Sequence, residues 1–186
     1  MSEGDATRFS LADTPIPSHQ PAIPEELVHA SLQALSGVTK AVFRPWIGER
    51  ITLIWLENEE RRLGMTRFEV GPNELARRRT LRIDPGEVTI GLHPALIEDT
   101  LLYNHTFVHE FLHAAGLMSH STLHDELTQS IAPSPSMKES PLLQRMRSSV
   151  LGEASVQQWS CKLCGYAWKR TTVRRPMRCL KCARPL

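Results

Sequence analysis

Two histidines one helical turn apart are the residues of this chain whose types and spacing most clearly suggest chemistry. The segment His109-Glu110-Phe111-Leu112-His113 lies in an apolar stretch that favours a helix. At 3.6 residues per turn, His109 and His113 project from one face and can bind one metal ion together. Glu110 can then act as general base toward a water molecule at the metal. The spacing predicts the core of a zinc-dependent peptidase. His105 shares this face, and we expect it to face solvent or to support a ligand.

A third metal ligand must come from outside this helix, because catalytic zinc usually takes three protein ligands. Gly116 allows the chain to turn back after the motif. Ser121 can cap a helix over residues 122–130, which places His120 before that helix and His124 in its first turn. We expect His120 to be the third ligand, with His124 as the alternative.

The four cysteines of the chain form a second motif near its carboxyl end. They make two C-x-x-C pairs, a spacing typical of a tetrahedral structural zinc site, the zinc ribbon. The alternative is a pair of disulfide bonds in a secreted protein, which we disfavour because no secretory signal opens the sequence. Gly165, after the first pair, suits a turn with positive φ. Metal binding should supply most of the folding free energy of so short a segment. The cysteines are Cys161, Cys164, Cys179 and Cys182.

Charge is divided unevenly along the chain. Residues 154–186 carry eight Lys and Arg side chains and no Asp or Glu, so the net charge of +2 leaves −6 for residues 1–153. Four thiolates on one Zn²⁺ would lower the +8 of this segment to about +6. Aromatic side chains interleave with the cations, and proteins hold single-stranded nucleic acid by such stacking and phosphate contacts. The alternative is that the aromatics form the ribbon's small core and the cations only solvate it. We predict nucleic-acid contacts for Lys169, Arg170, Arg174, Arg175, Arg178 and Trp168.

The rest of the sequence predicts an α+β fold, with a small antiparallel or mixed sheet packed on the helices that carry the H-E-x-x-H motif. The evidence is apolar periodicity, with proline and acids opening the first helix. We expect helices over residues 25–35, 100–117, 122–130 and 141–151, and strands over residues 51–56, 65–70, 80–83 and 88–92. The last two strands flank Asp84-Pro85-Gly86, a turn sequence, and are expected to form a hairpin.

These patterns divide the chain into four parts. They are a disordered tail (1–22), a metallopeptidase domain (23–131), a Pro-rich linker and helix (132–153) and a basic zinc ribbon (154–186). No apolar run approaches the roughly 20 residues of a membrane helix. We expect a monomer of the cytoplasm or nucleoid that does not engage a membrane.

Segments in order along the chain resemble the SprT-like, or Spartan-type, zinc metalloprotease family, and the resemblance covers residues 25–186. The segments are R-L-G-M-T at 62–66, I-G-L-H-P-A-L-I at 90–97, T-F-V-H-E-F-L-H-A at 106–114, and W-S-C-K-L-C-G-Y at 159–166 with the second cysteine pair. One feature departs from the family. Its third histidine is followed by a short polar stretch and an aromatic residue, whereas neither His120 nor His124 is followed by an aromatic.

The resemblance implies a zinc-dependent endopeptidase that acts on DNA-bound proteins or DNA–protein crosslinks. It implies one catalytic zinc with Glu110 as the base, and one structural zinc in the ribbon. The partners would be a protein substrate and DNA, single-stranded or junction-like. The residues by themselves also allow a zinc peptidase that is not coupled to DNA, or a non-catalytic nucleic-acid-binding zinc protein.

Overall fold

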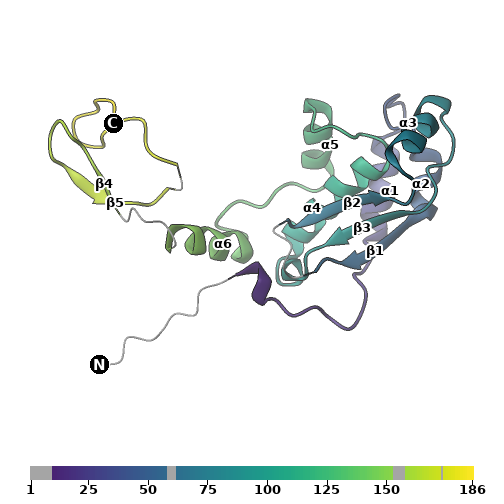
Figure 1. The fold of residues 1–186 in the computed structure, drawn as a ribbon, viewed down its shortest axis with the longest axis horizontal. Helices are drawn as coiled ribbons and strands as arrows, with labels where there is room; N and C mark the ends of the chain where they lie inside the picture. Colours follow the sequence, from purple (N-terminus) through teal and green to yellow (C-terminus); the bar gives the residue numbers. More distant parts are fainter. Residues whose placement is uncertain (1–9, 58–61, 153–157, 173) are drawn as a thin grey trace. The chain divides into compact units, whose positions relative to one another are not determined.

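The computed structural model of this chain describes residues 10–57, 62–152, 158–172 and 174–186 (Figure 1). The fold is α+β with a small mixed sheet, as predicted. The chain forms two compact units: one is Leu11–Leu142, and the other is Leu143–Leu186 together with the segment that ends at Ser10. Each unit is described by itself below.

The first unit contains a three-stranded sheet, five α-helices and two short 3₁₀ helices among its described residues. Its elements are η1 (Leu11–Asp13), α1 (Glu25–Ala34), α2 (Arg44–Arg50), β1 (Ile51–Trp55), β2 (Gly64–Phe68), α3 (Pro72–Leu81), β3 (Val88–Leu92), η2 (Pro94–Glu98), α4 (Thr100–Ala114) and α5 (Thr122–Ile131). Four of the predicted elements, α1, β1, α4 and α5, are confirmed to within a few residues. The strand expected over residues 65–70 is observed as β2.

Strand β3 is the centre of the sheet, whose strand order is β1-β3-β2. It pairs parallel with β1 and antiparallel with β2. Val88, Ile90 and Leu92 alternate along β3 and are fully buried, as expected for the middle strand of a covered sheet. Its central position in the sheet and the packing of α4 against it explain why β3 has no exposed position.

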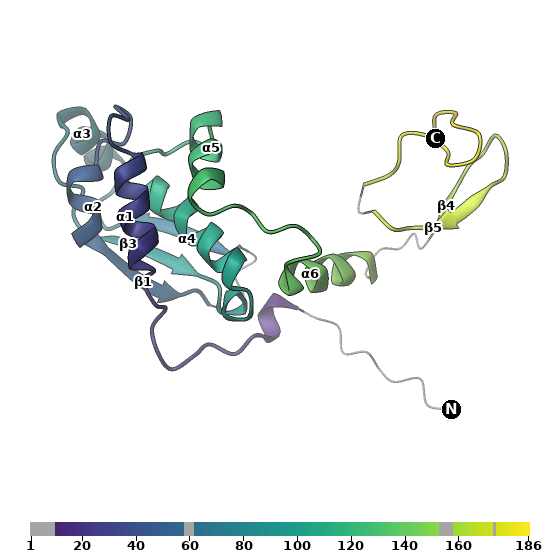
Figure 2. The same ribbon diagram turned by 180° about the vertical axis from the view of Figure 1, so that it is seen from behind.

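Helix α4 packs against β2 and β3 and also contacts α1 and α5. Figure 2 shows α1 and α4 on the same face of the sheet. The helix begins at an Asp99 cap, where Oδ1 accepts a hydrogen bond from the Leu102 backbone N–H at 3.0 Å. Phe107, Phe111 and Leu112 are fully buried. Helix α4 is therefore a core helix, and in its last two turns only the His109 and His113 side chains, which are half-buried, lie partly outside the core.

The strand predicted over residues 88–92 is confirmed as β3, but the strand predicted over residues 80–83, and with it the hairpin, is wrong. Residues 72–81 form α3, which ends in a left-handed residue, Arg82 (φ 52°). Pro72 occupies the first turn, and Arg78 donates to Glu74 at 2.8 Å one turn away, so local interactions favour the helix. The Asp84-Pro85-Gly86 turn does form, with Gly86 N–H donating to Asp84 Oδ1 at 2.7 Å, but it joins a helix to a strand.

The boundaries of the first unit differ from those expected from the sequence. Residues 1–9 of the predicted tail lie outside the described residues. In the part that is described, the His19 carbonyl accepts from Trp55 Nε1 and the Ala22 carbonyl accepts from Tyr103 Oη, each at 2.7 Å. At the other end, Leu142 is fully buried. The compact unit therefore includes residues on both sides of the 23–131 segment.

The second unit contains most of α6 (Pro141–Gly152) and a small antiparallel pair, β4 (Gln158–Ser160) and β5 (Ala167–Lys169). The helix from Pro141 is confirmed, and Trp159 lies directly opposite Trp168 across the strand pair. Within the described parts of the chain, no helix is long and apolar enough to cross a membrane.

Gly116 closes the turn after α4. Substituting it tests how tightly the loop before α2 packs against this turn. Its φ is +112°, and a Cβ atom would lie 3.0 Å from the Val42 backbone N. Gly116→Ala should lower the free energy of unfolding by at least about 2 kcal/mol, because it adds backbone strain and a clash with main chain. Gly37→Ala (φ +89°, open space) should cost about 1 kcal/mol. Gly71→Ala, also in open space, should change it by less than about 0.5 kcal/mol.

Urea denaturation followed by far-ultraviolet circular dichroism measures these differences. Equal stability of the Gly116→Ala and Gly71→Ala proteins would contradict the packing described here.

Candidate metal and catalytic site

The last two turns of α4 and the loop that follows bring three imidazoles together. The Nε2 atom of His120 lies 3.1 Å from Nε2 of His109 and 3.1 Å from Nε2 of His113. Tetrahedral zinc with Zn–N bonds of about 2.0–2.1 Å requires nitrogens about 3.3 Å apart. The two measured separations therefore fit ligands of a single ion.

The tautomer of His113 supports metal binding. Its Nδ1 lies 2.7 Å from the Leu117 carbonyl oxygen, which can only accept, so Nδ1 carries the proton. The Nε2 lone pair is then directed toward His120 and is available to a metal. A backbone carbonyl that fixes the second nitrogen is the usual support for a metal-binding histidine. Gly116 makes this contact possible by turning the chain back immediately after the helix.

His124 lies within the same cluster but in a different role. Nitrogen atoms of His109, His113 and His124 lie within 4.8 Å of one another and could also hold a metal ion. However, His124 Nε2 lies 3.2 Å from the His109 carbonyl oxygen and must donate to it, so this nitrogen has no lone pair to offer. The ring is fully buried and stacks on His113 with centroids 4.3 Å apart. The Nε2 separations favour His120 as the third ligand. However, Nδ1 of His124 keeps a lone pair and is buried without a hydrogen-bond partner, so His124 remains the alternative ligand.

Burial favours the neutral form of His109, His113 and His124, which is the form that binds metal. It lowers the pKa of His109 to about 4, and the neighbouring histidines add to the shift. Burial likewise lowers the pKa of His113 and of His124. His105 makes a different contact: its Nδ1 donates to the Ala132 carbonyl at 2.8 Å. That bond holds the chain after α5 against α4.

The carboxylate of Glu110 points into the packing between α4 and β2. It is 8% exposed, and its Oε2 accepts from the Thr66 hydroxyl at 2.7 Å. The two elements touch so closely here that a Cβ at Gly64 would lie 2.7 Å from Glu110 Oε1. Burial raises the pKa of Glu110, against the opposing effect of the Thr66 bond. A carboxylate with a raised pKa beside a metal site is suited to proton transfer.

The sequence did not assign a role to Thr66 or Gly64. Both lie within the R-L-G-M-T segment, so the family resemblance indicated the segment but not its contacts. The partner of Thr66 is 44 residues away, and no local pattern identifies such a pair.

The four cysteines of the second unit form a separate cluster. Their sulfur atoms lie within 4.8 Å of one another and could hold a metal ion. Two separations are 3.8 Å (Cys161 to Cys182) and 3.7 Å (Cys164 to Cys179). Tetrahedral zinc with Zn–S bonds of about 2.3 Å requires about 3.8 Å. A disulfide needs about 2.05 Å, and all four cysteines are free thiols.

Backbone donors in the loops lower the pKa of two of the cysteines, Cys161 and Cys179, whereas the pKa of Cys164 is raised. The backbone N–H groups of Cys182 and Lys181 donate to the sulfur of Cys179 at 3.5 and 3.3 Å. These donors lower the pKa of Cys179 to about 7. Gly165 has φ +69°, as predicted. The second unit therefore has the donor set of a structural metal site, and the residues do not themselves identify the metal.

The predicted nucleic-acid contacts differ in exposure. Lys169, Arg174, Arg175 and Arg178 are exposed. Arg170 is half-buried, with its guanidinium 5.1 Å from the centroid of the Trp159 ring. Trp168 is half-buried and stacks on Tyr166 with centroids 5.8 Å apart. Two tryptophans thus contribute to the packing of the hairpin, while four cations and part of Tyr166 face solvent.

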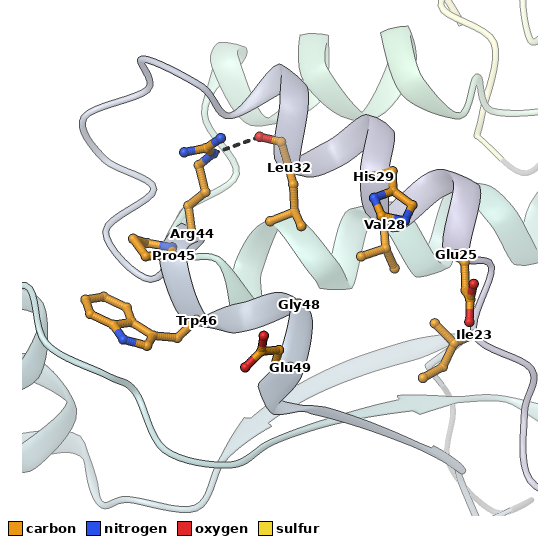
Figure 3. Close-up of a pocket in the computed structure, with 10 residues that line it drawn as sticks. All are labelled: Ile23, Glu25, Val28, His29, Leu32, Arg44, Pro45, Trp46, Gly48 and Glu49. Atoms are coloured by element: carbon orange, nitrogen blue, oxygen red, sulfur yellow. Dashed lines mark hydrogen bonds between the residues drawn. The ribbon is translucent and has the colours of Figure 1, made fainter.

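One cavity lies away from both clusters. It has a volume of about 470 Å³ and opens between α1 and α2 (Figure 3). Arg44 crosses one end, donating from Nε to the Leu32 carbonyl at 2.7 Å. Its lining includes none of the candidate site residues, and we assign it no chemistry.

Comparisons with family models, with curated proteins and with solved structures found no match to this chain. The functional conclusions below therefore rest on the residues and their geometry.

The choice between His120 and His124 is testable by metal content. His120→Ala should reduce bound metal by about one ion per chain, because it removes an Nε2 atom aimed at the other two. His124→Ala should retain the metal and lower stability, because it removes a buried, stacked ring. His105→Ala serves as the matched control and should retain all metal. Elemental mass spectrometry of the purified proteins measures the difference, and metal loss from His124→Ala alone would reverse the assignment.

Proposed function

We propose that this protein is a zinc-dependent endopeptidase of the SprT-like type. The observation that carries the proposal is the convergence of His109, His113 and His120 beside the buried carboxylate of Glu110. These three histidines would hold the catalytic zinc, and the four cysteines would hold a second, structural zinc. The donor sets fit this metal, since nitrogen and sulfur ligands at such separations suit tetrahedral coordination.

When bound, zinc supplies a Lewis acid that polarises a peptide carbonyl and lowers the pKa of water. The protein's own residues supply the rest. Glu110 accepts a proton at a carboxylate oxygen and delivers it to the leaving amine. Thr66 holds Oε2 of that carboxylate, which leaves Oε1 for proton transfer. Burial between α4 and β2 limits the carboxylate to one position and raises its pKa.

The edge strand β2 suits a protein substrate. The Leu63 carbonyl accepts from His93 N–H, and Glu69 N–H donates to the Glu87 carbonyl. In an antiparallel pair every second residue is hydrogen-bonded to the neighbouring strand, so Met65 and Arg67, between these two, also bond to β3. By this alternation, the backbone groups of Gly64, Thr66 and Phe68 point away from β3, toward the edge of the sheet. An extended peptide can add to such an edge as a further strand. It would then pass directly beside Glu110.

The second unit supports recruitment to nucleic acid. Its exposed cations can neutralise backbone phosphates, and Tyr166 offers a ring surface that is 40% exposed. Binding of the ribbon to DNA would raise the local concentration of the peptidase near DNA-bound proteins. We therefore propose DNA-bound proteins or DNA–protein crosslinks as substrates, cleaved at the nucleoid.

Glu110→Gln tests the peptidase assignment. The amide cannot accept the proton, so cleavage of a protein crosslinked to an oligonucleotide should fall by at least about 10²-fold. Metal content should stay unchanged, because Glu110 is not among the proposed ligands. Glu126→Gln, an exposed carboxylate on α5, is the matched control and should cleave normally. Wild-type cleavage by Glu110→Gln would show that the assignment is wrong.

The proposed ribbon contacts predict a salt-dependent affinity. Replacing Arg174, Arg175 and Arg178 together by Gln should weaken binding of a fluorescein-labelled single-stranded oligonucleotide. The slope of log affinity against log salt should fall by about 2, since each lost phosphate contact removes about 0.7. The same three positions changed to Lys should keep the wild-type slope. Unchanged affinity and slope in the Gln variant, measured by fluorescence anisotropy, would exclude these contacts.

A further inference from the structure

A second cavity lies beside the loop that carries His120. It has a volume of about 200 Å³, and its lining includes Lys40, Arg79, Ser119 and Ser121. The two serines flank His120 in the sequence, and the two cations come from distant parts of the chain. The cavity is therefore lined both by two cations and by the loop that carries His120.

Three segments of the first unit converge to build this cavity. Phe43 N–H donates to the Ala115 carbonyl at 3.0 Å, and a Cβ at Gly116 would lie 3.2 Å from the Lys40 carbonyl oxygen. The loop before α2 is therefore pressed against the turn after α4, which places Lys40 at the cavity. Arg79 comes from the last turn of α3. All of these contacts lie within the first unit.

The charges at this cavity are unbalanced. Arg77 and Arg78, on the same helix, donate to Glu74 at 3.2 and 2.8 Å. In contrast, Lys40 and Arg79 are exposed, and neither has an acidic partner among the described residues. These two cations lie in a part of the chain whose net charge is −6. Two cations that lie together without acidic partners, in a segment of negative net charge, indicate a site for an anionic ligand.

We propose that this cavity binds a backbone phosphate of nucleic acid on the peptidase unit itself; the choice of nucleic acid as the source of the phosphate rests on the proposed function. An ammonium group, a guanidinium group and a serine hydroxyl are the donors that phosphate oxygens take. The volume suits a single phosphate group and is below that of most small-molecule sites. The bound phosphate would contact the loop that presents His120. DNA would therefore lie next to the site of cleavage instead of only at the ribbon.

Single charge-neutralising variants of the full chain test the site. The probe is a fluorescein-labelled single-stranded oligonucleotide, and binding is measured in the Glu110→Gln background so that no cleavage is needed. Arg79→Gln and Lys40→Gln should each weaken binding roughly five- to tenfold at about 0.1 M salt and lower the salt slope by about 0.7. Arg77→Gln removes the same charge from the same helix and should stay within about twofold of the parent. Circular dichroism checks that each variant is folded.

Several outcomes would overturn the proposal. Unchanged affinity in Arg79→Gln and Lys40→Gln would do so, and if the ribbon variant still lost binding, the proposed function would stand without this site. Equal weakening by Arg77→Gln would show diffuse attraction instead of a defined site. In the cleavage-competent protein, Arg79→Gln could instead raise only the KM for peptides with acidic side chains and leave oligonucleotide binding unchanged. That result would make the cavity a substrate subsite. Failure of the parent protein to bind the oligonucleotide would exclude nucleic acid at both places.

Discussion

The close packing of β2 on α4 is the constraint on which the candidate site depends. One helix must turn Glu110 toward the sheet while presenting His109 and His113 to the loop beyond it. The Thr66 hydroxyl meets the buried carboxylate at 2.7 Å, and Gly64 leaves room for it. A larger side chain at that position would push the strand from the helix. The position of the proposed base, Glu110, and that of the histidine pair on the same helix therefore both depend on the close contact between β2 and α4.

The loop after α4 is constrained just as closely. Gly116 takes a backbone conformation that other residues adopt at a cost, and the loop carrying Lys40 packs directly against it. The same turn brings the Leu117 carbonyl to Nδ1 of His113 and His120 to Nε2. One turn thus fixes a histidine tautomer, positions a third imidazole and closes the cationic cavity. These features are coupled because they share a few residues of main chain.

The second unit depends on different physics. Its strands are three residues each and its aromatic side chains are only partly covered, so apolar burial contributes little to its stability. Four sulfur atoms at spacings suited to a tetrahedral ion replace the missing core. A ribbon stabilised in this way can leave its cations exposed, because they are not needed for folding. This freedom explains how the ribbon, residues 154–186, carries a side-chain charge of +8 before metal binding.

The sequence by itself determined the features that depend on local spacing. One helical turn separates His109 from His113, and the two C-x-x-C pairs bring sulfur atoms together within short loops. Helices α1, α4 and α5 follow from apolar period in the same way, with proline and acids opening α1 and Ser121 capping α5. Local spacing failed where two local signals competed: residues 80–83 have strand-forming side chains, yet the Glu74–Arg78 pair and Pro72 make α3 a helix.

Only the tertiary structure decided the contacts between residues far apart in the chain. The Thr66–Glu110 bond, the approach of His120 and His124 to the same two histidines, and the meeting of Lys40 with Arg79 at one cavity all depend on how β2, α3 and the turn after α4 pack together. Side-chain periodicity specifies which face of an element is buried, but not which distant element covers it.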